Sequence, residues 1–542
     1  MTLTMKKSAW LLLSSATLAG AQWLNFPTPG MPRTADGKPN LTATAPRLAD
    51  KPDLSGLWRR TGDKYSNNIA ADLKPGDVLP WADALYQERK LSFGKDFMSV
   101  KCLPWGPAYI FSPFQEVRIV QTPSVIVILN DDLTHREIWM DGRKLEDSPN
   151  PTWMGYSVGR WEGDTLVVES NGYNDKTWLD MSGNWHSDAL KVTERYQMTD
   201  ADTIQYEATL EDSKAYSKPW TLRFALKRRT DRDRLFEYVC TAEMEEETGL
   251  FDREVRTWYP GDGSAVPPIP ASTYTAAKIP AVAGLRRTPE EKPDLNGFYV
   301  PDGGGGNYGL EKHAGGLSPA GRGIIVDPPD GLLPMRPWAV EERVSRNLAE
   351  RGYDDPTAHC FPAGVPRGMY VPTSFQFIQT PDYFVILHER TAWRIIDMKR
   401  TQHLPDNLRL WQGDSIGHWE GDTLVFDTLS LHSSESGRTL VDRTGLMLSD
   451  AAHVVSRMRI NEAGQMEIRM TIDDAKALTA PWVVTKKFAR QEKGARAGTE
   501  ATALIAGFGA ACRAAEAALA TETPRLAALR ADAEAQLLKI AP

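Results

Sequence analysis

The strongest constraint on the fold is a long motif that occurs twice. Residues 153–168 read WMGYSVGRWEGDTLVV, and residues 411–426, which begin 258 positions later, read WQGDSIGHWEGDTLVF. A shared pattern of this length indicates two copies of one structural unit. In each copy the alternating residues, the Glu-Gly-Asp turn and the Thr-Leu-Val return segment predict a β-hairpin. We interpret the motif as structural, because carboxylates in such a turn usually face water.

Further repeated segments set the limits of the two copies. Copy 1 opens with KPDLSGLW at residues 51–58, and copy 2 opens with KPDLNGFY at 292–299. Segments of alternating or continuous apolar residues predict strands in both copies, at 116–120, 125–129 and 190–198 in copy 1 and at 375–378 and 383–387 in copy 2. One helix is expected early in each copy, at about 81–90 and 337–350.

The chain is therefore divided into six parts. These are a signal peptide (1–21), an extended lead-in (22–50), β-barrel copy 1 (51–245), a Pro-rich linker (246–290), β-barrel copy 2 (291–495) and an Ala-rich helical tail (496–542). The prolines of the linker favour a compliant connection between two separate barrels. The predicted fold is mainly β, with two tandem antiparallel barrels and a helical C-terminal tail.

Two resemblances agree with this division. The segment Asp53-Leu54-Ser55-Gly56-Leu57-Trp58 is similar to the G-x-W signature of lipocalins, which implies a barrel with Trp58 at its floor; copy 2 has Tyr299 in that place. The tandem K-P-D-L-S-G-x-W and G-R-W-E-G-D-T-L-V motifs also resemble those of an uncharacterised family of exported bacterial proteins. That resemblance implies the fold and export, but no reaction.

The N-terminal segment and the composition predict a periplasmic or secreted protein. Lys6 and Lys7 precede an apolar run, and Ala19-Gly20-Ala21 gives a small-x-small cleavage pattern, which is typical of a secretory signal peptide. No later segment is apolar for long enough to span a membrane. The net charge of −8 gives no indication of a nucleic-acid partner.

The four cysteines suggest two disulfide bonds. Cys102 and Cys360 occupy equivalent places, and Cys240 and Cys512 each lie near the end of a copy. In an exported chain this arrangement favours Cys102–Cys240 and Cys360–Cys512. Free buried thiols are the alternative, and the absence of C-x-x-C spacing makes a zinc site improbable.

The main candidate for chemistry is Glu194. In the segment 190–198 it shares the apolar face with Val192, Tyr196 and Met198, so the pattern places its carboxylate inside the barrel. A buried carboxylate must be paired, hydrogen-bonded or neutral, and an apolar pocket would raise its pKa into the range useful for acid–base catalysis. Copy 2 carries Ser456 at the aligned place.

Neighbouring residues complete the predicted site in copy 1. His186 is the candidate proton shuttle, with Glu194 as its partner and Asp180 as a third catalytic residue. Trp178, Tyr196 and Tyr206 are the candidate ligand-binding residues. The alternative is that Glu194 forms a buried pair with an arginine or a tyrosine and that His186 lies on the surface.

Other sites are less well supported by the sequence. The histidines of copy 2 lack the spacing of a metal site, and the Gly303–Gly306 run lacks the context of a phosphate-binding loop. The segment 155–159 fits G-x-S-x-G, but it lies inside the repeated hairpin with no helix after it. We expect no metal and no cofactor.

Two functions are consistent with these patterns. The first is an enzyme, a lyase, hydratase or isomerase, that acts on a small apolar molecule in the copy 1 pocket by cofactor-free acid–base chemistry. The second is a lipocalin-like carrier that binds such a molecule without turnover. The sequence does not identify the molecule or the oligomeric state.

Overall fold

The computed structural model describes residues 32–491 with several gaps. The omitted positions in this range are 63, 67, 93–94, 96, 108–111, 113–114, 232–233, 241–283, 303–309, 313–322, 347–354, 360, 372, 390–391, 405–407, 433–439 and 447. The predicted signal peptide, the C-terminal tail and most of the Pro-rich linker lie outside the described residues, as do Cys360 and Cys512.

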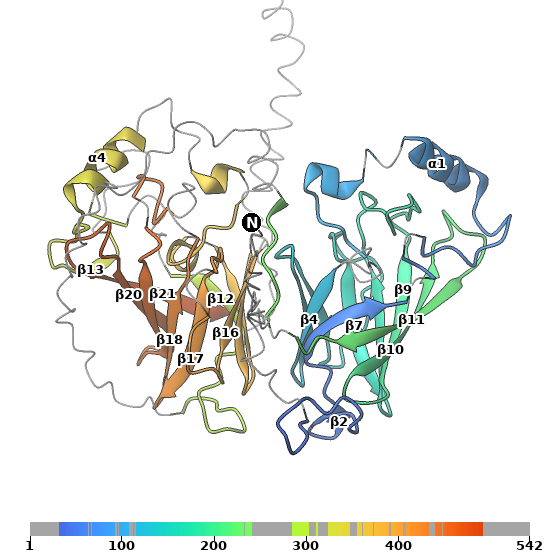
Figure 1. The fold of residues 1–542 in the computed structure, drawn as a ribbon, viewed down its shortest axis with the longest axis horizontal. Helices are drawn as coiled ribbons and strands as arrows, with labels where there is room; N and C mark the ends of the chain where they lie inside the picture. Colours follow the sequence, from blue (N-terminus) through green and yellow to red (C-terminus); the bar gives the residue numbers. More distant parts are fainter. Residues whose placement is uncertain are drawn as a thin grey trace, which may run out of the picture. The chain divides into compact units, whose positions relative to one another are not determined.

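Copy 1 forms a closed barrel of nine strands (Figure 1). The strands follow in chain order and the last pairs with the first: β3 (Gly56–Thr61), β4 (Glu116–Gln121), β5 (Val125–Asn130), β6 (His135–Trp139), β7 (Tyr156–Glu162), β8 (Thr165–Asn171), β9 (Lys191–Met198), β10 (Thr203–Glu211) and β11 (Trp220–Arg228). A short ribbon, β1 (Arg47–Leu48) with β2 (Lys51–Pro52), precedes them. We call this unit barrel 1.

Copy 2 repeats the arrangement as barrel 2. Pairing of its first and last strands closes the barrel, and one further strand, β13 (Ile325–Asp327), pairs with β21. The barrel strands are β12 (Gly297–Pro301), β14 (Phe375–Gln379), β15 (Tyr383–His388), β16 (Ala392–Asp397), β17 (Asp414–Glu420), β18 (Thr423–Leu429), β19 (His453–Ile460), β20 (Met466–Asp473) and β21 (Trp482–Gln491). The prediction of two tandem β-barrels is confirmed.

The barrels differ from a simple antiparallel meander in one place. In each barrel one neighbouring pair is parallel, β6 with β7 and β16 with β17. This pair explains a glycine of the repeated motif: a Cβ on Gly159 would lie 2.8 Å from Ile138 Cγ2 of β6, and one on Gly417 would lie 2.7 Å from Ile396 Cγ2 of β16. The hairpin β7–β8 forms as predicted, and its turn residue Asp164 pairs with Arg47 at 3.0 Å on the surface.

The tryptophan of the lipocalin-like motif, Trp58 of β3, packs in the core of barrel 1. Trp58 is fully buried, and its Nε1 donates to the Leu54 carbonyl at 2.8 Å. The Arg228 guanidinium lies 4.2 Å from the Trp58 ring centroid and donates to the Ser55 carbonyl. A cation over an indole in a desolvated place stabilises this packing. Figure 1 shows β2 at one end of barrel 1 and α1 at the other.

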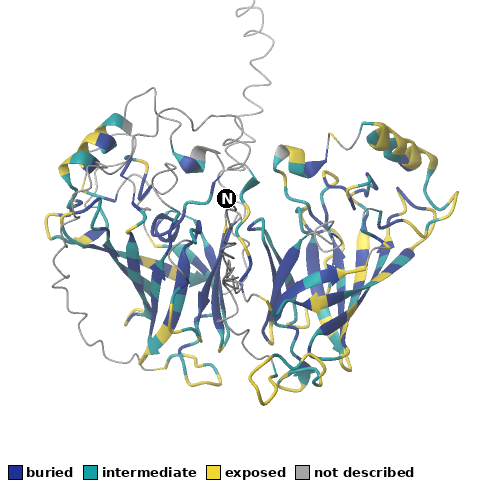
Figure 2. Ribbon diagram, in the orientation of Figure 1, coloured by how far each residue is buried: buried dark blue, intermediate teal, exposed yellow. Residues whose placement is uncertain are grey.

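The predicted early helices are present as α1 (Pro80–Leu91) and α4 (Pro337–Arg346). Prolines open both helices, where the missing N–H costs no hydrogen bond. Only Ala82 of α1 is buried, so this helix lies on the surface (Figure 2). Among the described helices, none is both long and apolar enough to cross a membrane.

Each barrel has an apolar interior, and a third buried cluster draws on both. The Trp393 Nε1 of barrel 2 donates to the Asn130 carbonyl of barrel 1 at 2.8 Å. Strands β5 and β15 bury every residue because both of their faces are covered. The cluster includes Leu57, Val120, Val127 and Leu129 of barrel 1 and Tyr383, Val385, Leu387 and Ile395 of barrel 2. The barrels therefore share apolar surface, which no pattern in the sequence indicates.

Candidate functional site

Glu194 lies inside barrel 1, on the face of β9 that the sequence predicts, and it is 1% exposed. Its carboxylate forms a two-point ion pair with Arg136 of β6, in which Nη1 is 3.0 Å from Oε1 and Nη2 contacts Oε2. The hydroxyls of Tyr196 and Tyr206 donate to Oε1 at 2.8 and 2.9 Å. Glu194 therefore accepts hydrogen bonds on both oxygens from groups that are themselves buried.

Arg136 is held on its other side by two serines of the neighbouring strands. Its Nε donates to Ser157 Oγ at 3.0 Å and its Nη2 to Ser170 Oγ at 2.7 Å. Burial alone would lower the pKa of Arg136, but the charge of Glu194 raises it well above its ordinary value. Burial and the same negative charge raise the pKa values of Tyr196 and Tyr206, so both phenols stay protonated as donors.

This network corrects the predicted partner of Glu194. The side chain pairs with Arg136, Tyr196 and Tyr206, and the contacts of His186 do not include it. A bidentate arginine satisfies a buried carboxylate better than a histidine can, because it brings a permanent charge and parallel N–H groups. Tyr196 and Tyr206 hold Glu194 in place.

His186 is fully buried rather than on the surface. Its Nδ1 is 3.0 Å from the Ser187 carbonyl, which can only accept, so Nδ1 carries the proton. Nε2 then accepts from the Thr177 hydroxyl at 2.6 Å. Burial lowers the pKa of His186, which favours this neutral form. Both ring nitrogens are thus occupied, and the arrangement fixes the loop that follows β8.

Asp180 lies in the same loop and is 7% exposed. Its Oδ1 accepts the backbone N–H groups of Ser182, Gly183 and Asn184 at 3.0–3.1 Å. Its Oδ2 accepts from the Ile69 N–H at 2.9 Å and from the Asn184 side chain at 2.6 Å. Burial raises the pKa of Asp180, and these hydrogen bonds oppose the rise. Its first role is to shape the turn.

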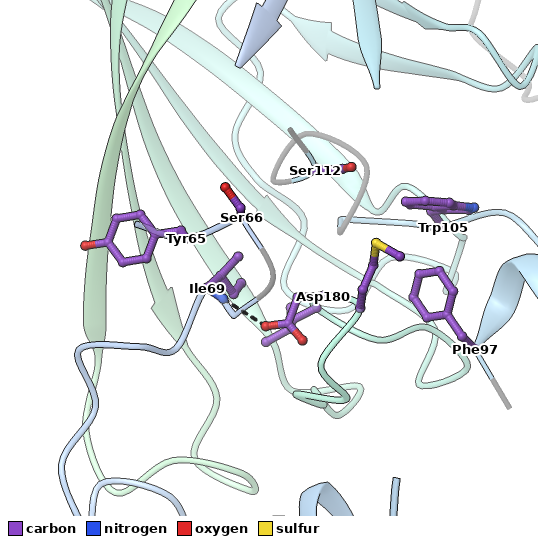
Figure 3. Close-up of a pocket in the computed structure, with 9 residues that line it drawn as sticks. Tyr65, Ser66, Ile69, Phe97, Trp105, Ser112 and Asp180 are labelled. Atoms are coloured by element: carbon purple, nitrogen blue, oxygen red, sulfur yellow. Dashed lines mark hydrogen bonds between the residues drawn. The ribbon is translucent and has the colours of Figure 1, made fainter. Parts of the chain in front are cut away.

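A small cavity, whose volume of about 250 Å³ includes space open to solvent, lies at this turn, at the loops of barrel 1 (Figure 3). Figure 3 shows the Asp180 carboxylate beside Ile69, with Phe97 and Trp105 on the opposite side. The lining is largely aromatic and apolar with a few oxygen atoms; it consists of Tyr65, Ser66, Ile69, Phe97, Trp105, Ser112, Leu179, Asp180 and Met181. We call this cavity the end pocket.

The aromatic wall of the end pocket is supported from behind by Trp178. Phe97 packs edge-on against Trp105 and Trp178, with ring centroids 5.0 and 5.4 Å apart. The Arg89 guanidinium of α1 covers the other side of Trp178 at 4.1 Å. Trp178 thus supports the wall, while Phe97 and Trp105 face the cavity.

The Cys102–Cys240 disulfide, which the sequence predicts, is present next to this wall. Cys102 directly follows the short helix η1 (Met98–Lys101), whose Met98 packs with Phe97 and Trp178. The Cα atoms of the two cysteines are 5.4 Å apart, within the usual range. The bond therefore ties the end of the barrel 1 chain to the segment that carries Phe97 and Trp105.

Of the predicted site residues that the structure describes, Asp180 lines the end pocket, whereas Glu194 and His186 are not among its lining residues. Sequence reasoning missed Arg136 and the lining residues Tyr65, Ile69 and Phe97. The sequence does contain a pattern that could have identified Arg136 as an inward-facing residue. Arg136 alternates with the apolar Ile138, and it recurs as Arg394 at the same offset as the hairpin motif. The lining residues come from irregular loops, and no pattern in the sequence identifies them.

Among the residues that the structure describes, no group of three or more histidine, cysteine, aspartate or glutamate side chains is placed to hold a metal ion. Comparison of the chain with protein-family models, with curated proteins and with solved structures finds no match.

Proposed function

We propose that the protein is an exported binding protein that holds a small, largely apolar molecule in the end pocket of barrel 1. The observation that carries this proposal is the cavity itself, which combines an aromatic and apolar wall with a few oxygen atoms. Binding sites for small molecules typically have this composition. The disulfide supports export, because such bonds persist in oxidising compartments.

The dimensions and lining of the end pocket define the class of ligand. Because its volume of about 250 Å³ includes space open to solvent, the end pocket encloses only a small group, of at most about one ring. Phe97 and Trp105 offer ring faces and edges for stacking. Ser66, whose hydroxyl is 3.3 Å from the Gly62 carbonyl, can exchange a hydrogen bond with one polar substituent. We therefore expect a compact aromatic molecule with a single hydroxyl or carbonyl group.

The first prediction is that filling the end pocket weakens this binding. Ser66→Trp places an indole at the cavity, so one-ring compounds that bind the wild type should bind this variant at least about tenfold more weakly, a loss of about 1.4 kcal/mol. Ligand-observed NMR with a library of one-ring compounds gives the measurement. Leu91→Trp is the matched control, because Leu91 is 80% exposed on α1 and away from the lining.

Compounds that bind both variants as tightly as the wild type would place the binding site elsewhere. A library with no compound that binds the wild type saturably would contradict the proposal itself. Thermal unfolding of each variant, recorded in parallel, separates loss of the pocket from loss of the fold.

Acid–base turnover in the same pocket is a second candidate, favoured by one observation. The Asp180 carboxylate lines the cavity, and burial raises its pKa, as a general acid requires. Turnover of an identified ligand by the wild type, lost by about 10²-fold in Asp180→Asn with the variant still folded, would support this function. Binding of the ligand without any conversion would exclude it for that ligand.

A further inference from the structure

Barrel 2 repeats the buried arginine of barrel 1 without its carboxylate. Arg394 of β16 corresponds to Arg136 of β6, and it too is fully buried inside its barrel. Its Nη2 donates to Thr428 Oγ1 at 2.7 Å and to Ser415 Oγ at 3.1 Å. These hydroxyls stand where Ser170 and Ser157 stand in barrel 1, so the guanidinium is held in the same way.

On its remaining side, the Arg394 guanidinium has different neighbouring residues from those of Arg136 in barrel 1. Ser456 takes the place of Glu194, since each pairs with the same strand positions: Glu194 with Val168 and Ala208, Ser456 with Phe426 and Met470. The two tyrosines that bind Glu194 are replaced by Met458 and Ile468, as the same pairing shows.

Two polar atoms at this place have no hydrogen-bond partner. They are Arg394 Nη1, whose counterpart in barrel 1 binds Glu194, and Ser456 Oγ. No ion pair joins Arg394 to a carboxylate in the described part of the chain, although the Phe426 ring lies 5.0 Å from its guanidinium. An unmade hydrogen bond at a buried charged group costs more than one at a neutral group.

The carboxylate that acts on Arg394 is that of Glu237, whose Oε1 has no hydrogen-bond partner among the described residues although it lies near Arg234. Its Oε2 accepts from the Gln412 N–H at 3.1 Å, and its Oε1 lies 3.7 Å from Arg234 Nη2. Burial lowers the pKa of Arg394 to about 9, and the charge of Glu237 only partly opposes this shift. The protein thus retains a cation in an apolar interior without a dedicated counter-ion, which is costly.

We propose that the interior of barrel 2 is a binding site for a small apolar monocarboxylate, whose carboxylate takes the place beside Arg394 that Glu194 fills in barrel 1. Arg394 Nη1 and Ser456 Oγ would bind the carboxylate oxygens. The apolar part would lie among Met458, Ile468 and Met470, where flexible methionine side chains adapt to a guest more readily than branched ones.

The test uses octanoate as the probe, with octanol and chloride as comparisons, on the full-length exported protein. Calorimetric titration should show saturable binding of octanoate to the wild type and none of octanol at the same concentration. Ser456→Glu supplies the missing carboxylate from the protein, so octanoate should bind at least about tenfold more weakly and the melting temperature without ligand should rise. Ser66→Trp, at the end pocket of barrel 1, should bind octanoate like the wild type.

Arg394→Met keeps the test decisive if Ser456→Glu does not fold, because it removes the buried charge and fills similar space. It should also lose octanoate binding and should be at least as stable as the wild type without ligand. Equal octanoate binding by wild type and Arg394→Met would overturn the proposal, as would no saturable binding to the wild type. Binding of chloride but not of octanoate would likewise overturn it, because the site would then accept an inorganic anion only.

Discussion

Glu194→Ala is expected to lower the free energy of unfolding by about 3–5 kcal/mol, because it leaves Arg136 charged and unpaired in the interior of barrel 1. The same change removes the acceptor of both Tyr196 and Tyr206. Denaturant unfolding followed by tryptophan fluorescence gives the measurement. Replacing the pair together, with Glu194→Leu and Arg136→Met, should cost much less than the single change, because no uncompensated charge remains.

Glu207→Ala is the matched control for this prediction. Glu207 lies on the adjacent strand β10, on the opposite face from Tyr206, and pairs with Arg223 at 2.6 Å near the solvent. A surface pair contributes only about 0–1 kcal/mol, so the control should remain close to the wild type. A Glu194→Ala variant as stable as this control would show that the buried network does not hold barrel 1 together.

Removing the disulfide with Cys102→Ser and Cys240→Ser should lower the free energy of unfolding by about 4–5 kcal/mol. The two cysteines are 138 residues apart, and in the chain-entropy model the stabilisation grows with the length of the closed loop. The loss should extend to ligand binding, because Cys102 follows the segment that carries Phe97. Denaturant unfolding with and without a bound one-ring compound measures both effects.

Reduction of the wild type with a thiol should produce the same shift as the double substitution. An unchanged unfolding midpoint after both treatments would contradict the stabilising role of this bond. A peptide map of the unreduced protein that lacks the Cys102–Cys240 link would contradict the bond itself.

The sequence predicts the parts of this fold that depend on short-range periodicity. Alternation in the segment 190–198 places Glu194 on the core face of β9, and the structure confirms that placement. The repeated motif predicts the β7–β8 hairpin, and its Gly159 is needed because the neighbouring parallel strand lies too close for a Cβ. Periodicity and spacing in the sequence indicate which face of a strand a residue occupies.

The parts that the sequence does not predict depend on proximity between distant segments. Arg136 and Glu194 are 58 positions apart and meet only because the barrel closes around them. The end pocket joins residues 65, 66 and 69, residues 97, 105 and 112, and residues 179–181, and no apolar pattern in the sequence predicts that these meet. His186 looks like an available base in sequence, yet Thr177 and the Ser187 carbonyl occupy both of its nitrogens.

We propose that barrel 1 binds its ligand in the end pocket and uses Glu194 for structure. Calorimetric titration of one bound one-ring compound into wild type, Ser66→Trp and Glu194→Gln, at a temperature where all three are folded, tests it most directly. We predict a dissociation constant for Glu194→Gln within about twofold of the wild type and, for Ser66→Trp, affinity at least about tenfold weaker. Loss of binding in Glu194→Gln with unchanged binding in Ser66→Trp would contradict this proposal. The ligand would then bind in the interior of barrel 1, beside Glu194.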